Sequence, residues 1–237
     1  MIGGVKEGLN PAVIHLNEDG SAAFETCQSG TYGKRNEAVG DFLEGQFFVC
    51  GGLGGTDVEY SEIKSDCQVI VDFGSMTFSM SMYMSANRRI GAASVKLNES
   101  TLWITGGDGK NPSSTEFITT FYEPIPGIDL PFKIYGHCMV QYKPDYVLLI
   151  GGSHTELNKK TWIIDISNGF DINEGPSLKE GRLDHSCGKM KDDYGNVLVI
   201  VAGGDKLNSV EVLNTTLMKE WSQGNHLQST DIYLIVT

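Results

Sequence analysis

Two histidines occupy corresponding places in the sequence and could carry chemistry. His137 and His185 each follow a basic residue, Lys133 and Arg182, by a few positions. A neutral imidazole can bind a metal or transfer a proton near neutral pH. A catalytic histidine need not recur along a chain, whereas a histidine that serves packing does. We therefore predict two structural histidines that hydrogen-bond between strands, with no catalytic residue, no metal site and no cofactor.

Three arginines precede predicted strands and could bind an anionic partner. Arg88, Arg89 and Arg182 carry planar guanidinium groups, which can hold both oxygens of a carboxylate at once. The alternative is that these arginines pair with acidic loop residues of the neighbouring structural unit. Both interpretations stay open from the sequence.

The glycine-rich segment GGLGGTDVE, residues 51–59, has some likeness to a phosphate-binding loop. It lacks the Gly-Lys-Ser/Thr ending of such loops, and no predicted helix follows to direct its N-terminus at an anion. We therefore interpret it as a flexible turn that follows a buried strand.

Five glycine pairs recur along the chain, at residues 3–4, 51–52, 106–107, 151–152 and 203–204. Their intervals are 48, 55, 45 and 52 residues, and a period near 50 is typical of propeller arrays. The four internal pairs each follow a continuous apolar run: QFFVC, TLWIT, YVLLI and VLVIVA. Such runs indicate strands that are buried on both faces.

Other features recur in phase with the glycine pairs. A second strand is predicted after each pair, at 12–17, 67–73, 115–121, 161–166 and 209–214. An aromatic residue follows in most units: Phe24, Phe78, Phe170 and Trp221. A polar link then leads to a basic residue and another strand, within 34–43, 88–97, 133–142 and 181–190. About four short antiparallel strands per unit make one blade of an all-β propeller.

Blade packing explains the glycines. A residue without Cβ lets a neighbouring backbone come close and tolerates the positive φ of a sharp turn. The predicted structural glycines are Gly51, Gly52, Gly106, Gly107, Gly151, Gly152, Gly203 and Gly204.

These features together resemble the kelch repeat. The signature is a double glycine after an apolar strand, then a Val-Glu-Val-like strand, a later aromatic residue and an Arg-x-x-His-like segment. The best-matched unit runs from 181 to 221, and the resemblance covers essentially the whole chain. It implies a propeller that binds a partner protein through inter-strand loops. No segment with helical period is present for a BTB or BACK region, so the chain would supply only a recognition part.

The same resemblance extends to galactose oxidase, a copper-radical enzyme built on this blade type. The atom types of its site could come from a set of five residues with the repeat's own spacing: Tyr135, His137, Tyr142, His185 and Cys187. No separate ligand cluster accompanies them, so we expect a non-catalytic interaction module. The alternative is a copper-radical oxidase or other carbohydrate-active enzyme on the same fold.

We expect one domain, 1–237, with four to five blades. The approximate units are 3–50, 51–105, 106–150, 151–202 and 203–237. Kelch propellers usually close with six or seven blades, so the sequence predicts an incomplete ring or a fragment. The alternative is a five-bladed ring in which residues 232–236 close on residues 1–4.

Charge and hydropathy narrow the class of partner. The net charge of -12 disfavours nucleic acid and anionic lipid surfaces as partners. No apolar run approaches the roughly 18 residues of a membrane helix, and the first residues lack the apolar region of a signal peptide. A protein partner is the remaining expectation, with a cytosolic or a secreted location equally open.

Five cysteines are present, without metal-binding spacing. Cys50 and Cys67 flank a loop between adjacent strands, so they are either a disulfide of a secreted chain or two buried thiols. Cys138 and Cys187, in neighbouring strands, are expected to be buried and free. If the chain is secreted, Asn98 and Asn214 are predicted acceptors of N-glycans, because each begins an Asn-x-Ser/Thr sequon.

The predicted binding face is formed by the loops after the glycine pairs and the segments before the first strands, because propellers vary there without disturbing their sheets. Its candidate residues are Asp57, Arg88, Arg89, Asp108, Lys110, His154, Arg182 and Asp205.

Overall fold

The described residues form four antiparallel sheets of four strands each, which we call blades 1 to 4. The computed structural model describes residues 12–16, 22–26, 34–56, 59–72, 77–83, 89–121, 124–153 and 155–224. Blade 1 comprises β4 (Val39–Leu43), β5 (Gln46–Cys50), β8 (Asp66–Asp72) and β9 (Thr77–Tyr83). Blade 2 comprises β10 (Ala93–Asn98), β11 (Thr101–Thr105), β12 (Thr115–Thr119) and β13 (Ile125–Pro126). Blade 3 comprises β14 (Cys138–Lys143), β15 (Tyr146–Ile150), β16 (Thr161–Asp165) and β17 (Asp171–Glu174). Blade 4 comprises β18 (Ser186–Lys191), β19 (Val197–Ala202), β20 (Val210–Asn214) and β21 (Ser222–Gln223).

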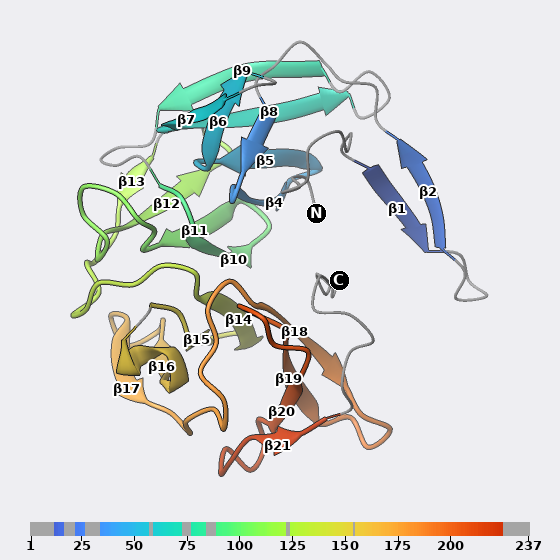
Figure 1. Ribbon diagram of the computed structural model, residues 1–237, viewed down its shortest axis with the longest axis vertical. Coiled ribbons are helices and arrows are strands. Elements are labelled where there is room, and N and C mark those ends of the chain that lie inside the picture. The colour runs from blue at the N-terminus through green and yellow to red at the C-terminus, as the bar shows by residue number, and fades with distance from the viewer. Residues whose placement is uncertain are drawn as a thin grey trace.

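The blades follow one another around a common centre, as in a β-propeller (Figure 1). Strands β4, β10, β14 and β18 are innermost, and each of the first three contacts the innermost strand of the following blade. The predicted all-β propeller is therefore confirmed. The described residues contain four such blades, and the predicted pairing of residues 232–236 with residues 1–4 lies outside them.

Two smaller sheets accompany the blades. Strands β1 (Ala12–Leu16) and β2 (Ala22–Thr26) pair with each other. Strands β3 (Lys34–Asn36), β6 (Leu53–Thr56) and β7 (Glu59–Ile63) form a three-stranded sheet. The β6–β7 hairpin is inserted between β5 and β8, and this insertion explains why the interval of 55 residues after Gly51 is the longest of the repeat. The predicted turn over 51–59 is thus wrong, because a strand forms there.

Helix is almost absent from the described residues. A short 3-10 helix, η1 (Glu156–Lys159), follows the glycine pair of blade 3. Within the described part of the chain, no helix has the length and apolar character needed to cross a membrane.

The apolar strands β11 and β15 are buried on both faces, as predicted. Strands β5 and β19 each border only one described blade, and Phe47, Leu198 and Ile200 on them are half-buried. On β11, Leu102 and Ile104 pack with Phe48 of blade 1, whereas Trp103 packs with Val147 of blade 3. Side chains alternate across a strand, so a strand between two blades needs apolar residues at every position. The three apolar clusters of the structure accordingly lie between successive blades.

Two of the predicted recurring aromatic residues fill the space between blades. Phe170 lies edge-on to Trp103, with ring centroids 5.0 Å apart. Trp221 is fully buried, and its Nε1 donates to the carbonyl of Pro176 at 2.8 Å. Both aromatic residues therefore join neighbouring blades, as the repeat requires.

The glycine pairs lie where backbones of successive blades meet. All eight of these glycines have positive φ: Gly51, Gly52, Gly106, Gly107, Gly151, Gly152, Gly203 and Gly204. A Cβ on Gly106 would lie 2.4 Å from the carbonyl oxygen of Ile134 in the next blade. The N–H of Gly107 donates to that same oxygen at 2.9 Å, so close backbone approach between blades requires glycine here. The structural role predicted for these glycines is confirmed.

The described residues contain two disulfides: one joins the second and third strands of blade 1, and the other joins the innermost strands of blades 3 and 4. Cys50 of β5 and Cys67 of β8 face each other in the ladder of blade 1 and are bonded, which was one of the two predicted alternatives. Cys138 of β14 and Cys187 of β18 are also bonded, so the prediction of free thiols is wrong for this pair. The two innermost strands run side by side, and this neighbourhood brings the sulfur atoms together.

Removing the disulfide between blades should destabilise the protein. The Cys138→Ala/Cys187→Ala variant is expected to lose about 2–4 kcal/mol in free energy of unfolding, because the bond closes a loop across 49 residues and restricts the unfolded chain. Urea titration measures this loss. Dithiothreitol should lower the urea midpoint of the wild type, but not that of a variant without Cys50, Cys67, Cys138 and Cys187. Equal midpoints for wild type and Cys138→Ala/Cys187→Ala would contradict the expectation.

Candidate acidic pocket at the centre of the propeller

Each blade places one residue with positive φ two positions before its innermost strand. These residues are Glu37 (φ 52°), Gly91 (φ 62°), Gly136 (φ 61°) and Asp184 (φ 54°). The N–H of Gly136 donates to the carbonyl of Gly91 at 2.7 Å, and the N–H of Asp184 donates to the carbonyl of Gly136 at 2.8 Å. The left-handed conformation thus directs the backbone from blade to blade, and we call these four residues the inner ring.

Glycine in two blades leaves room for carboxylates from the other two. A Cβ on Gly136 would lie 2.5 Å from Oδ1 of Asp184, and a Cβ on Gly91 would lie 3.5 Å from Oε2 of Glu37. Glutamate and aspartate in the left-handed region are less favourable than glycine. The inner ring therefore carries two acidic side chains at positions where the backbone favours glycine.

A pocket of about 290 Å³ opens at this inner ring. Asp108 and Asp205, which directly follow the glycine pairs of blades 2 and 4, line it together with the ring carboxylates. Their backbone N–H groups donate to the carbonyls of Ile90 and Leu183, at 2.7 and 2.9 Å. The complete lining is Glu37, Ile90, Asp108, Tyr135, Leu183, Asp184 and Asp205.

The pocket has a strongly negative electrostatic character. Burial raises the pKa of Glu37 above its usual range, and the carboxylates of Asp184 and Asp108 raise it further. Burial, Asp108 and Asp184 likewise raise the pKa of Tyr135, which keeps its hydroxyl protonated. No basic side chain lines this pocket among the described residues. A cation bound here would relieve the repulsion between the carboxylates.

The structure brings two of the predicted binding-face residues into the pocket, Asp108 and Asp205. Lys110 is exposed on the same loop as Asp108 but does not line the pocket. Asp57, Arg88 and His154 lie outside the described residues.

Arg89 and Arg182 are buried structural residues, so their predicted place on the binding face is wrong. Arg182 is 1% exposed and donates to both Glu211 and the carbonyl of Gly203, the latter at 2.7 Å. Arg89 is 2% exposed and makes the same pair of contacts in blade 2, with Glu116 and the carbonyl of Gly106. The acidic partner lies on the third strand of the same blade, not on a loop of the next blade as the alternative supposed. Each arginine thus fixes a glycine pair to its own sheet.

His137 joins two blades, as predicted. Its Nε2 lies 2.8 Å from Oγ1 of Thr105, the last residue of β11 in blade 2. His185 occupies the corresponding place between blades 4 and 3, but Ile150 stands where blade 2 has Thr105. Both ring nitrogens of His185 are buried without a hydrogen-bond partner among the described residues, so the predicted hydrogen bond between strands is wrong for this histidine. The pKa of each histidine is lowered to about 3, mainly by burial. The charges of His185 and Arg89 contribute to the lowered pKa of His137, and the charge of Arg182 contributes to that of His185.

The residues considered for copper do not form one cluster. Cys187 is bonded to Cys138. Tyr142 lies five residues along β14 from His137, which is about 16 Å of strand, and its ring contacts Tyr146. Within the described ranges, no group of three histidine, cysteine, aspartate or glutamate side chains is placed to hold a metal ion.

Sequence reasoning missed the pocket residues Glu37, Ile90, Leu183 and Asp184, and it considered Tyr135 only as a possible copper ligand. The signal was present, because aligning the four segments before the innermost strands places Glu37 and Asp184 at one position, opposite two glycines. Two acidic residues at a position that otherwise favours glycine indicate a role in the site.

Comparison with known proteins supports the fold. No protein-family model and no curated protein matches the chain. Among solved structures, the structure of YjhT is similar, with a TM-score of 0.71 and 14% sequence identity over 88% of this chain and 75% of that chain. The chain therefore has the β-propeller fold.

Proposed function

We propose that the chain is a non-catalytic, kelch-type interaction module whose central pocket receives a cationic side chain of a partner protein. The observation that carries the proposal is the set of four carboxylates that line one pocket, with no basic side chain among the described residues of its lining. The recurrent glycine pairs, buried arginines and inter-blade aromatic residues support the kelch-type assignment.

The size of the pocket favours a single side chain over a larger ligand. Small-molecule sites usually occupy about 300–1,000 Å³, and this pocket, at about 290 Å³, lies at the lower limit. Ile90 and Leu183 add aliphatic surface beside the carboxylates. Arginine and lysine combine an aliphatic stem with a cationic head, so both parts would find complementary surface. Arginine fits best, because its planar fork can bind two carboxylates at once.

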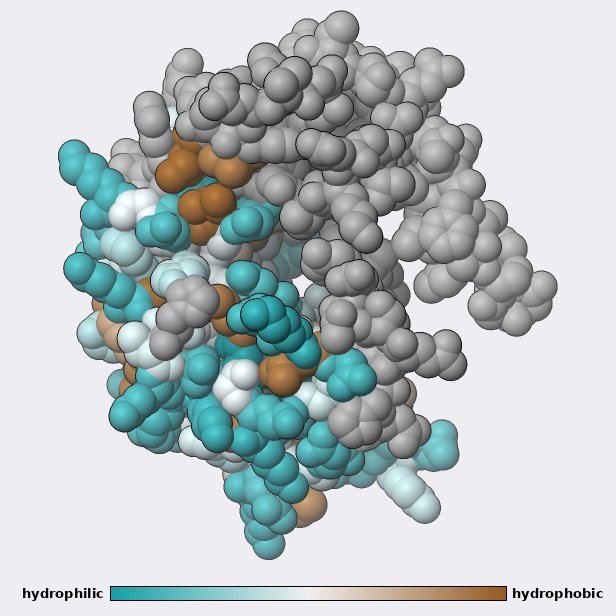
Figure 2. Space-filling view, in the orientation of Figure 1, coloured by the Kyte–Doolittle hydropathy of each residue, from teal (hydrophilic) through white to brown (hydrophobic). Residues whose placement is uncertain are grey.

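Surface character agrees with recognition by polar contacts. In Figure 2, hydrophilic residues cover most of the visible face over blades 3 and 4. A charged pocket within a polar surface is typical of an interface where electrostatic complementarity sets specificity and the rate of association.

Small cations test the pocket directly. Titration with n-butylguanidinium, followed by amide NMR, should shift the signals of Ile90, Asp108, Leu183 and Asp205 with a dissociation constant on the order of millimolar. The Asp108→Asn/Asp205→Asn variant should weaken this binding about tenfold or more, because two of the four carboxylates lose their charge. High salt should weaken it as well.

A matched control separates pocket charge from net charge. Asp145 and Asp193 lie in the turns before β15 and β19, away from the pocket, so Asp145→Asn/Asp193→Asn makes the same change in net charge without altering the pocket. This control should bind n-butylguanidinium like the wild type. Equal weakening in both double variants, or equal shifts with neutral n-butanol, would contradict the proposed pocket.

A further inference from the structure

We infer that Asn98 and Asn214 are N-glycosylated, and that their glycans cover the face of the propeller opposite the acidic pocket. This inference concerns a covalent modification and does not depend on which partner the pocket binds. It rests on the geometry of two Asn-x-Ser/Thr turns, on their place in the blades and on the two disulfides.

Asn98 begins the turn between β10 and β11 and is exposed. Its Oδ1 accepts hydrogen bonds from the backbone N–H of Ser100 at 3.0 Å and from the Ser100 hydroxyl at 3.1 Å. The residue between them, Glu99, has a side chain that is 84% exposed. The carbonyl side of the amide is thus held by the turn, and the hydroxyl that the sequon requires lies beside the acceptor asparagine.

Asn214 ends β20 and is half-buried, and the Thr216 hydroxyl of its sequon donates to Oδ1 of Asn196 at 3.3 Å. The Oδ1 of Asn214 accepts from the backbone N–H of Thr216 at 2.9 Å, and Thr216 is exposed. Neither Asn98 nor Asn214 donates a hydrogen bond from Nδ2 to any described residue. In both turns the nitrogen that would carry the sugar has no acceptor in the described part of the chain.

Both asparagines lie at the ends of strands that are far from the pocket. β11 and β19 run toward the glycine pairs, and the pocket residues Asp108 and Asp205 follow those pairs. Asn98 pairs with Thr101 at the start of β11, and Asn214 pairs with Leu198 near the start of β19. Four or more residues of strand, about 13 Å or more, therefore separate each asparagine from the pocket end of its blade.

The disulfides indicate a compartment where this modification occurs. Structural disulfides persist in oxidising environments and are rare in the cytosol. The described residues contain two of them, Cys50–Cys67 and Cys138–Cys187, and the latter ties two blades together. These bonds fit a chain that folds in an oxidising compartment, and the lumen in which sequons are read is one such compartment.

The chemistry requires an activated sugar donor, which is an oligosaccharide linked to a polyprenyl diphosphate. The Nδ2 of asparagine forms a bond to the anomeric carbon of the first sugar and gives up one proton. The bond between that carbon and the diphosphate oxygen breaks, and the polyprenyl diphosphate leaves. No oxidant or reductant takes part.

A third site with nearly the same motif provides an internal contrast. Asn111-Pro112-Ser113 lies in the loop that follows Asp108, at the pocket end of blade 2, and its proline prevents glycosylation. The two sequons that lack this block therefore lie on one face, and the blocked tripeptide lies on the other.

The test begins with the endogenous protein, isolated with an antibody and treated with peptide-N-glycosidase F. This enzyme converts a glycosylated asparagine to aspartate, and mass spectrometry of peptides should find that conversion at Asn98 and Asn214. For the recombinant chain directed through a secretory pathway, Asn98→Gln and Asn214→Gln should each remove one glycan. Pro112→Ala should add a glycan at Asn111, because the change converts the blocked tripeptide on the pocket face into a sequon.

Unmodified Asn98 and Asn214 in the endogenous protein would overturn the inference. Conversion at only one of them would overturn it for the other. The glycosylated chain should also bind n-butylguanidinium as tightly as the enzymatically deglycosylated chain, because the glycans lie on the opposite face. Weaker binding by the glycosylated form would overturn their assignment to that face.

Discussion

Replacing Arg182 with methionine is expected to lower the free energy of unfolding by about 3–5 kcal/mol, because the change leaves a buried charge without its partner. Arg182 and Glu211 are 1% and 0% exposed. The guanidinium donates to Oε1 of Glu211 from two nitrogens, at 3.1 and 3.3 Å, and also to backbone carbonyls of Gly203 and Ser209. Methionine fills much of the same volume but supplies no donor, so several buried acceptors lose their hydrogen bonds.

The double variant Arg182→Met/Glu211→Gln should recover a large part of this loss. Glutamine removes the buried charge, and its Oε1 can still accept from the backbone N–H of Lys179 or Glu180, as Glu211 does. Blade 3 shows that the fold accommodates uncharged residues at these places, since it has Ile134 and Trp162 there. A coupling energy of about 2 kcal/mol from the double-mutant cycle would identify the ion pair as the cause.

Lys160→Met provides the control for the arginine prediction. Lys160 and Glu174 also form an ion pair, but their side chains are 37% and 58% exposed. An exposed pair is worth less than about 1 kcal/mol, so this variant should unfold at nearly the wild-type urea concentration. If Arg182→Met and Lys160→Met lowered stability equally, Arg182 would not have the structural role assigned to it.

The strands and the glycine pairs could be predicted because their signals are local and repeat. A strand between two blades needs apolar side chains on both faces, so β5, β11, β15 and β19 coincide with the four apolar runs. The unit boundaries of the sequence differ from those of the sheets. Each sheet takes its first two strands from one predicted unit and its last two from the next. The reason is that the strand before a glycine pair hydrogen-bonds to a strand that follows the pair.

The site could be predicted only in part, because it depends on how blades meet in space. Asp184 reaches the pocket while Arg182, two residues earlier, turns into its own blade, and the sequence contains no local sign of this difference. Asp108 and Asp205 were found because they follow the glycine pairs. Cys138 and Cys187 were correctly placed in neighbouring strands, but their bond depends on the stagger of those strands.

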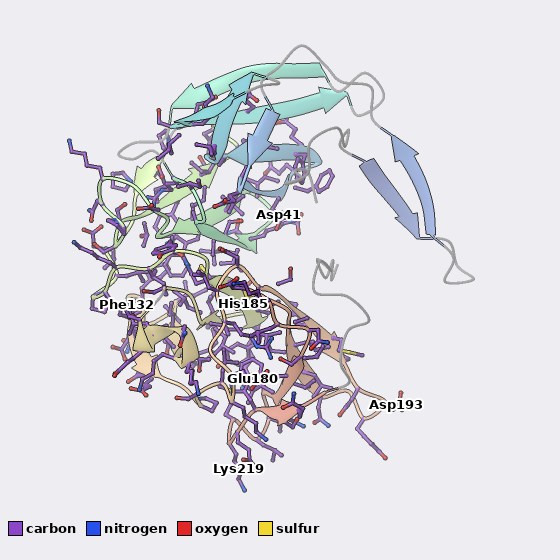
Figure 3. All side chains as sticks on the ribbon, viewed as in Figure 1. Asp41, Phe132, Glu180, His185, Asp193 and Lys219 are labelled. Carbon is purple, nitrogen blue, oxygen red and sulfur yellow. A yellow bond between two sulfur atoms is a disulfide. The ribbon has the colours of Figure 1, made fainter. Side chains whose placement is uncertain are left out.

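Stability should fall steeply in acid because of the two buried histidines. His185 lies near the centre of the blades, whereas Asp193 and Lys219 lie at the periphery (Figure 3). In the folded state the pKa of both His137 and His185 is about 3, and an unfolded histidine has its ordinary value of about 6.5. Because the folded pKa is lowered, the stabilisation is present above about pH 6.5 and is lost as the pH falls toward 3.

Each histidine that takes up a proton on unfolding contributes about 1.4 kcal/mol per pH unit, so the pair contributes about 2.7 kcal/mol per unit between roughly pH 6 and 4. Urea titrations at several pH values measure this slope. His137→Leu and His185→Leu should each reduce it by about half of the histidine contribution, and the double variant should remove that contribution entirely. The comparison uses the slope, so the loss of the Thr105 contact in His137→Leu changes only the starting stability. A double variant with the wild-type slope would show that other groups control acid unfolding and that these histidines are not held neutral by burial between the blades.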